Sequence, residues 1–244
     1  MEKPSSITDN DWKLLKAKYK NIKRAIKKID KNYPVQYLIG YVDFYGYKIN
    51  VNKNVLIPRF ETETLIEKTI EYIKKYNLTN GSLIDLGTGS GCISIVLKKE
   101  IENLNITSLD ISKKALKLAK KNAKQNHADI SFIRHNIFKY KPVNKYDILI
   151  SNPPYISVDD EVSPQIKYEP KNAIYSKGDV LKYYKHILST CNNYLNKKNI
   201  IAFEINESQG KSLKELAKEY FPKAKIKLEK DLAKKDRYLF IINE

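Results

Sequence analysis

Residues 146–155, YDILISNPPY, carry the strongest structural signal in the chain. The apolar run from Ile148 to Ile150 is typical of a strand buried in a parallel sheet. That strand must end at Pro153 and Pro154, because proline has no N–H to donate to a neighbouring strand. A residue before a proline is held extended, so Asn152 and Pro153 are both stiff. The stretch therefore predicts a buried strand that ends in a rigid turn.

The predicted turn presents hydrogen-bond acceptors beside an aromatic ring. The side-chain carbonyl of Asn152 and the nearby backbone carbonyls would point in fixed directions next to Tyr155. Such acceptors suit a planar group that carries an NH2, for example a carboxamide or a nucleobase amine. An ordinary strand-ending turn also explains a Pro-Pro pair. A second motif is therefore needed to choose between the two interpretations.

This second motif is SLIDLGTGSG at residues 82–91, a buried strand that leads into closely spaced glycines and an apolar helix. The glycines allow positive φ and let backbone N–H groups at the helix start approach a ligand. The next predicted strand, residues 105–109, ends in Asp110. A ribose-binding carboxylate is expected about 20 residues after such a loop. Asp110 could instead cap the following helix, residues 112–127, although Ser112 is available for that role. The GxGxG spacing, in place of GxGxxG, favours a nucleoside ligand without a phosphate.

Strands and helices alternate through the rest of the chain. This alternation predicts an α/β fold with a doubly wound, mostly parallel, Rossmann-like sheet. Ligands of such sheets bind at the carboxyl ends of the strands, where residues 85–91, Asp110, residues 136–137 and residues 152–155 would meet. The loop at residues 156–177 is long enough to form a lid. The further expected helices cover residues 64–76, 179–195 and 211–220, and the further strands cover residues 130–134, 199–205, 224–228 and 237–242.

The N-terminal part has a different pattern. Residues 11–29 show apolar steps of three and four, which predict one amphipathic helix within a helical segment at residues 1–33. Residues 34–58 alternate and contain turn residues, so they predict a β-hairpin linker. Residues 59–244 would form the main domain.

Composition narrows the possible functions. The 244 residues are 42% hydrophobic, enough for one large core plus an accessory piece. No apolar run approaches the roughly 18 residues that a membrane helix needs, and no signal peptide is evident, so a cytoplasmic protein without membrane contact is expected.

The two cysteines lie far apart, so neither a metal site nor a disulfide is predicted. The net charge of +17 fits nucleic-acid contact or a lysine-rich compositional bias, and both interpretations stay open. A monomer is expected.

Together, the glycine loop, Asp110 and the Asn-Pro-Pro-Tyr motif resemble class I S-adenosylmethionine-dependent methyltransferases that modify planar NH2 groups. Further segments resemble the protein-(glutamine-N5) methyltransferases of class 1 peptide chain release factors, the PrmC/HemK family. The resemblance covers about residues 35–242. The segments that carry it are Pro58-Arg59-x-Glu61-Thr62-Glu63, Glu169-Pro170 with Ala173, Asp231-Leu232 and Asp236-Arg237.

The resemblance implies a site for S-adenosylmethionine, with S-adenosylhomocysteine as product. The glycine loop would pass under the methionine part, and Asp110 would accept hydrogen bonds from the ribose hydroxyls. Asn136 and Ile137 stand where the family usually has an aspartate and an aromatic residue near the adenine. The implied cofactor-binding residues are Asp85, Gly87, Thr88, Gly89, Ser90, Gly91, Asp110, Asn136, Ile137 and Asn152.

The resemblance also implies the substrate, the glutamine of the release factor's Gly-Gly-Gln motif. The catalytic residues would be Asn152, Pro153, Pro154 and Tyr155, which hold the glutamine amide, and Arg59 and Glu61 would also contact the substrate. The family usually carries an N-terminal helical bundle that grips the release factor, whereas this chain has room for about one helix there.

Three other functions remain open from the residues. A nucleic-acid amine methyltransferase acting on adenine or cytosine would use the same acceptors, but no separate target-recognition domain is visible. A glutamine methyltransferase of a ribosomal protein is a closer alternative, which the Glu-Thr-Glu segment disfavours. A non-catalytic binding subunit would have no need of an intact Asn-Pro-Pro-Tyr motif.

Overall fold

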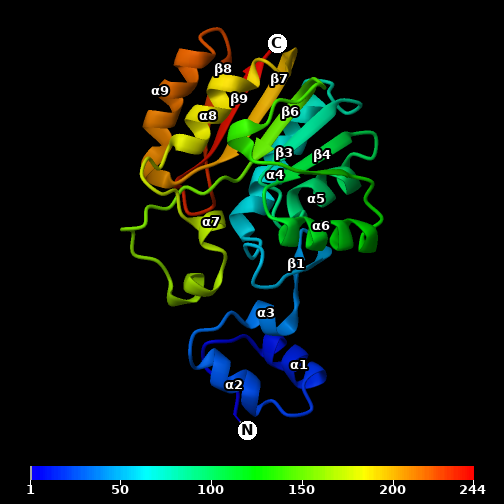
Figure 1. Ribbon diagram of the computed structural model, residues 1–244, viewed down its shortest axis with the longest axis vertical. Helices are drawn as coiled ribbons and strands as arrows, with labels where there is room; N and C mark the ends of the chain where they lie inside the picture. Colours follow the sequence, from blue (N-terminus) through cyan, green and yellow to red (C-terminus); the bar gives the residue numbers. More distant parts are fainter. Residues whose placement is uncertain (1) are drawn as a thin grey trace.

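The structure is a computed structural model that describes residues 2–244. A small helical module lies at the N-terminal end of a larger α/β domain, and a β-hairpin joins them (Figure 1). The module contains α1 (Asp9–Lys18), α2 (Lys23–Ile29) and α3 (Val35–Ile39). The hairpin consists of β1 (Tyr41–Phe44) and β2 (Tyr47–Asn50), paired antiparallel.

The prediction of a single helix over residues 11–29 is wrong. The chain leaves the helical conformation at Tyr19, whose backbone is extended and whose hydroxyl donates to the Leu38 carbonyl at 3.0 Å. The break lets α2 fold back, so that Leu15, Ala25 and Leu38 join one small apolar core. Burial of both halves against α3 outweighs the continuity of a longer helix, because a helix gains most of its stability from packing. The predicted helical segment at residues 1–33 therefore holds two helices in place of one, and α3 occupies the start of the stretch predicted as a β-hairpin linker, residues 34–58.

The mostly parallel sheet predicted for the main domain is confirmed. Its seven strands run in the order β5-β4-β3-β6-β7-β9-β8. The pairs from β5 to β7 are parallel, whereas β9 pairs antiparallel with both β7 and β8. The strands are β3 (Ser82–Leu86), β4 (Asn105–Asp110), β5 (Ser131–Arg134), β6 (Tyr146–Ser151), β7 (Leu195–Glu204), β8 (Lys225–Lys230) and β9 (Asp236–Asn243).

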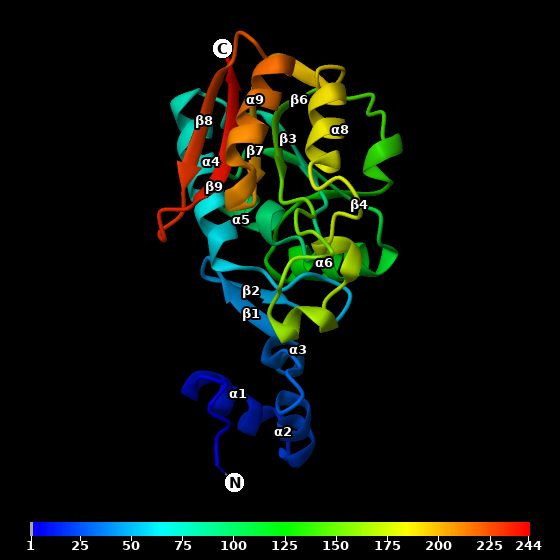
Figure 2. The same ribbon diagram turned by 90° about the vertical axis from the view of Figure 1, so that its left-hand side faces the viewer.

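Helices cover both faces of this sheet (Figures 1 and 2). Successive residues of β6 show why: Ile148 and Ile150 pack with α4 and α5, whereas Leu149 packs with α8 and α9 on the opposite face. Both faces are apolar because side chains alternate along a strand that is covered on both sides. The helices are α4 (Phe60–Lys75), α5 (Cys92–Glu100), α6 (Lys113–Gln125), α8 (Lys182–Cys191) and α9 (Gly210–Tyr220).

The loop at residues 156–177, predicted as a lid, contains two short helices, η2 (Pro164–Tyr168) and α7 (Lys171–Ile174). Its outer end reaches the helical module, because the Tyr168 hydroxyl donates to the Lys31 carbonyl at 2.7 Å and its ring meets Tyr33 edge-on. Across residues 2–244, no helix is long and apolar enough to cross a membrane. Cys92 and Cys191 are buried free thiols. Within residues 2–244, no group of three or more histidine, cysteine, aspartate or glutamate side chains could hold a metal ion.

Candidate active site

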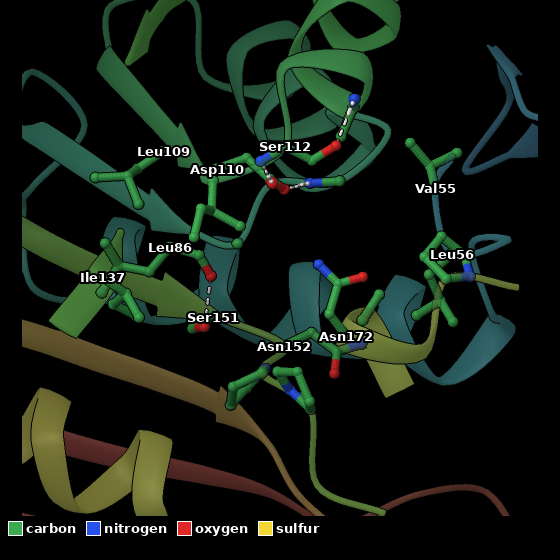
Figure 3. Close-up of a pocket in the computed structure, with 18 of the residues that line it drawn as sticks. Val55, Leu56, Leu86, Leu109, Asp110, Ser112, Ile137, Ser151, Asn152 and Asn172 are labelled. Atoms are coloured by element: carbon green, nitrogen blue, oxygen red, sulfur yellow. Dashed lines mark hydrogen bonds between the residues drawn. The ribbon is translucent and has the colours of Figure 1, made fainter. Parts of the chain in front are cut away.

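A cavity of about 470 Å³ opens where the strand order reverses, at the carboxyl ends of β3, β4 and β6. This is the position at which doubly wound sheets bind their ligands. Figure 3 shows Asp110 and Ser112 on one side of the cavity, and Asn152 and Asn172 on the opposite side. The sequence-predicted residues that line it are Gly87, Gly89, Asp110, Asn136, Ile137, Asn152, Pro153 and Pro154.

The glycine loop follows β3 and crosses one end of the cavity. Gly87, Gly89 and Gly91 all have positive φ, of 84°, 56° and 84°. A Cβ on Gly91 would also lie 3.1 Å from the Cβ of Ala119, so this glycine lets α5 and α6 approach closely. The loop is held down on β4, since the N–H groups of Gly87 and Thr88 both donate to the Leu109 carbonyl, at 2.8 and 3.0 Å. The backbone can therefore approach a ligand with no side chain in between.

Asp85 supports this loop from behind. Its Oδ2 accepts hydrogen bonds from Thr88 Oγ1 at 2.6 Å and from Ser94 Oγ at 2.8 Å. Oδ1 is buried and has no partner within residues 2–244. Complete burial raises the pKa of Asp85 to about 6. Asp85, Thr88, Ser90 and Gly91 thus shape the loop without lining the cavity, and direct contact with a cofactor stays a prediction for them.

Asp110 joins the loop to the start of α6. Its Oδ2 accepts from the Gly89 N–H at 2.9 Å, and its Oδ1 accepts from the Ser112 N–H at 2.8 Å. Ser112 caps α6, because its Oγ accepts from the Ala115 N–H at 3.2 Å. Burial raises the pKa of Asp110. Each carboxylate oxygen can accept a second hydrogen bond, so Asp110 can hold the loop and still bind a hydroxyl pair.

Ile137 and Phe138 form an apolar wall of the cavity. Asn136 starts this wall, since its Oδ1 accepts from the Phe138 N–H at 3.0 Å and closes a tight turn. The Phe138 ring packs against Tyr183 and His186, with ring centroids 5.0 and 4.9 Å away. Phe138 and Tyr183 were not predicted as site residues from the sequence. The adjacency of Phe138 to Ile137 was a usable signal, whereas nothing local indicated that α8 would supply Tyr183.

Asn152 closes the other side of the cavity. Its Nδ2 donates to Thr62 Oγ1 at 3.3 Å, and Thr62 Oγ1 donates to Glu204 Oε2 at 2.6 Å. Tyr155 lies behind the cavity wall and donates from its hydroxyl to Glu204 Oε1 at 3.2 Å. Burial raises the pKa values of both Tyr155 and Glu204. Neither Thr62 nor Glu204 was predicted as a site residue from the sequence, because both contact residues that are distant in the chain.

Arg59 and Glu61 do not line the cavity. Arg59 forms an ion pair with Glu169 at the end of the lid, and Glu61 is exposed near the start of α4. Glu169 is buried, and its Oε2 also accepts from the Ile57 N–H at 2.9 Å. The ion pair therefore ties the lid to the segment before α4. Substrate contact by Arg59 and Glu61 stays a prediction.

We expect Glu169→Ala to destabilise this junction. The change leaves the buried Ile57 N–H without an acceptor and Arg59 without its partner, which together cost roughly 1–3 kcal/mol of unfolding free energy. Urea unfolding measures the loss, with Glu161→Ala, in the exposed part of the same loop, as the matched control. Equal unfolding midpoints for the two variants would show that Glu169 does not hold the lid.

Comparisons with known proteins show the family to which the chain is similar. The family model "Methyltransferase small domain" matches residues 62–207, which include the glycine loop, Asp110 and Asn152. A release factor glutamine methyltransferase of Bacillus cereus is 39% identical over 227 residues, covering 91% of this chain and 80% of the relative. One of Bacillus subtilis is 36% identical over 222 residues, covering 88% and 77%.

Solved structures share the fold. A methyltransferase from Pyrococcus furiosus superposes with a TM-score of 0.59 at 16% identity, covering 96% of this chain and 98% of that one. A release factor-specific protein-(glutamine-N5) methyltransferase from Alicyclobacillus acidocaldarius gives 0.51 at 21% identity, covering 80% and 99%. With relatives this similar over most of both sequences, and with a methyltransferase fold around the cavity, the chain belongs to the release factor glutamine methyltransferase family.

Proposed function

We propose that this protein methylates the side-chain amide nitrogen of the glutamine in the Gly-Gly-Gln motif of class 1 release factors, with S-adenosylmethionine as methyl donor. The observation that carries the proposal is the position of Asn152 and its two prolines on the wall of the cavity, opposite Asp110. Acceptors for an amide NH2 and acceptors for ribose hydroxyls thus share one cavity. Family membership supports both the reaction and the substrate.

The residues present fit the proposed cofactor. Asp110 offers free acceptor positions for two hydroxyls, and Ile137 with Phe138 offers an apolar wall for a base. Gly87 and Gly89 leave their end of the cavity free of side chains, and a Cβ on Gly87 would meet no heavy atom within 4 Å. When bound, S-adenosylmethionine supplies a methyl group on a positively charged sulfur, which takes the bonding electron pair as the methyl leaves.

Asn152 and the Pro153 carbonyl would orient the substrate amide. An amide nitrogen is a weak nucleophile, because its lone pair is delocalised into the carbonyl. If both N–H bonds donate to protein oxygens, the lone pair points away from them, and the positive charge that develops on nitrogen is stabilised. The nitrogen then gains a methyl and releases one proton to solvent. No strong general base is needed, because the nitrogen becomes acidic only as the new bond forms.

Mass spectrometry tests this proposal directly. A class 1 release factor is incubated with the protein and S-adenosylmethionine, beside a version whose Gly-Gly-Gln glutamine is replaced by alanine. We expect a gain of one methylene mass on the native Gly-Gly-Gln peptide and no gain on the alanine version. Methyl incorporation into ribosomal protein or into RNA, but not into the release factor, would contradict the proposal and identify one of the alternatives.

A further inference from the structure

A buried carboxylate lies directly behind the Asn152 turn. Glu204, the last residue of β7, is 2% exposed, and hydroxyl groups reach both of its oxygens. Thr62 Oγ1 lies 2.6 Å from Oε2, and the Tyr155 hydroxyl lies 3.2 Å from Oε1. An O–H···O distance of 2.6 Å is typical of an ionised acceptor. Burial raises the pKa of Glu204, whereas the two hydroxyl donors and the positive charge of Arg237 act in the opposite direction. Above that raised pKa Glu204 is a carboxylate anion, and the 2.6 Å contact with Thr62 Oγ1 fits this state.

This anion decides the direction of the next hydrogen bond. A threonine hydroxyl has a single hydrogen, and an ionised carboxylate can only accept. The Thr62 hydrogen must therefore point at Glu204, which leaves only lone pairs of Thr62 Oγ1 to face Asn152 at 3.3 Å. Only the NH2 end of the Asn152 amide can donate to them. The carbonyl end of the same amide is then turned away from Thr62.

We propose that Thr62 and Glu204 are positioning residues that keep the carbonyl of Asn152, and not its NH2, facing the cavity. Asn152 lines that cavity, and no donor among residues 2–244 reaches its Oδ1. A carbonyl oxygen there accepts from a substrate NH2 and repels a carboxylate of the same shape. The inference rests on the proposed function and adds a reason for selecting glutamine over glutamate: a site built to hydrogen-bond an NH group rejects the analogue that lacks it.

The hydrogen-bond chain from Glu204 through Thr62 to Asn152 is called the relay below. Paired variants of Thr62 test it. Thr62→Val keeps the shape and removes the hydroxyl, so the Asn152 amide loses the partner that sets its direction. We expect kcat for release factor methylation to fall by about tenfold or more, the effect of losing one hydrogen bond of roughly 1.5 kcal/mol. Affinity for S-adenosylhomocysteine should stay unchanged. Thr62→Ser, which keeps the hydroxyl, should restore most of kcat.

The matched control is Thr69→Val. Thr69 lies on the same helix and is also buried, but its hydroxyl donates to the Leu65 carbonyl at 2.7 Å, away from the cavity. We expect this variant to lose stability without losing kcat. Equal kcat values for Thr62→Val and the wild type would overturn the relay, as would an equal loss of kcat in Thr62→Val and Thr69→Val.

The pH dependence of kcat provides a second test, because a residue that only packs in the core would leave this dependence unchanged. Thr62 and Tyr155 donate to the Glu204 carboxyl, and the charges of Arg237 and Glu61 act on it. The other titratable groups close enough to interact with it are Cys92, Tyr184 and Tyr238. As the pH falls through its raised pKa, Glu204 gains a proton and can itself donate to Thr62. The Thr62 hydroxyl is then free to donate to an inverted Asn152 amide, so kcat should fall on the acid side. Glu204→Gln has no proton to gain, and its kcat should lack this acid limb. An identical acid limb in Glu204→Gln would overturn the role of Glu204.

A spectroscopic test separates this inference from the proposed function. In ¹⁵N-labelled protein without substrate, the Asn152 side-chain NH2 signal is assigned by its disappearance in Asn152→Asp. We expect the signal to shift and to exchange faster with solvent in Thr62→Val but not in Thr62→Ser. An unchanged signal in Thr62→Val would overturn the relay. If Thr62→Val shows the expected shift but the wild-type protein methylates no release factor, the proposed function is overturned while the hydrogen-bond relay is supported.

Discussion

Asn152→Ala should abolish most of the turnover while leaving cofactor binding nearly intact. The change removes from the cavity wall the side chain that we propose as acceptor for the substrate amide. Removal of one such oriented group from an active site typically costs 10²- to 10³-fold in kcat. Asn152 makes its only side-chain hydrogen bond within residues 2–244 to Thr62, so the glycine loop and Asp110 should keep their positions. Single-turnover methylation of a release factor measures the loss, and calorimetry with S-adenosylhomocysteine measures binding.

Asn136→Ala is the matched control for this experiment. Asn136 also lines the cavity, but its side chain accepts from the Phe138 N–H and serves the local turn. We expect a modest weakening of cofactor binding and little change in kcat at saturating cofactor. Loss of cofactor binding together with retained turnover in Asn152→Ala would contradict the assigned role.

Asp110→Ala should produce the opposite result, a large loss of cofactor affinity. The variant loses the proposed acceptors for the ribose hydroxyls, and it also releases the Gly89 N–H that shapes the glycine loop. Hydrogen bonds to a charged group contribute roughly 1.5–3 kcal/mol each, so affinity for S-adenosylhomocysteine should fall by about tenfold to more than a hundredfold. Asp129→Ala removes the same charge from an exposed site near the end of α6 and should bind normally.

The pH dependence of binding follows from the burial of Asp110. Because burial raises its pKa, the carboxylate gains a proton at a higher pH than an exposed aspartate would. The protonated group accepts fewer hydrogen bonds, so affinity should fall as the pH is lowered through that raised pKa. Unchanged affinity in Asp110→Ala, or binding that is independent of pH over this range, would show that the ribose is held elsewhere.

Local signals predicted much of the fold. Apolar strand runs, the glycine loop and the Pro-Pro turn all depend on neighbours in the chain, and the strand predicted before the two prolines is β6 (Tyr146–Ser151). The observed ends of some helices and strands differ from the predicted ends, where tertiary packing outweighed the local preference for helix or strand. The helix expected at residues 179–195 is α8 (Lys182–Cys191), because β7 takes Leu195 as its first residue and pairs it with Tyr146.

The candidate site was predictable only in part, for the same reason. Asp110, Gly87, Gly89 and Asn152 end strands or begin loops, so the rule for parallel sheets places them at one edge. Tyr183 reaches the cavity from a helix that carries no ligand motif. Arg59 was assigned to the substrate, yet it pairs with a glutamate 110 residues further along the chain.

The sequence by itself determined the order of strands and helices, the strand ends at which ligands bind, and the chemical kind of the site. Each of these depends on backbone preferences and side-chain periodicity within a few residues. Only the tertiary structure decided that the predicted N-terminal helix breaks into α1 and α2, which pack on α3, and that Thr62 meets Glu204 across 142 residues of sequence. Such contacts depend on how whole helices and strands pack, and a buried polar group takes its hydrogen-bond partner from whichever element that packing brings next to it.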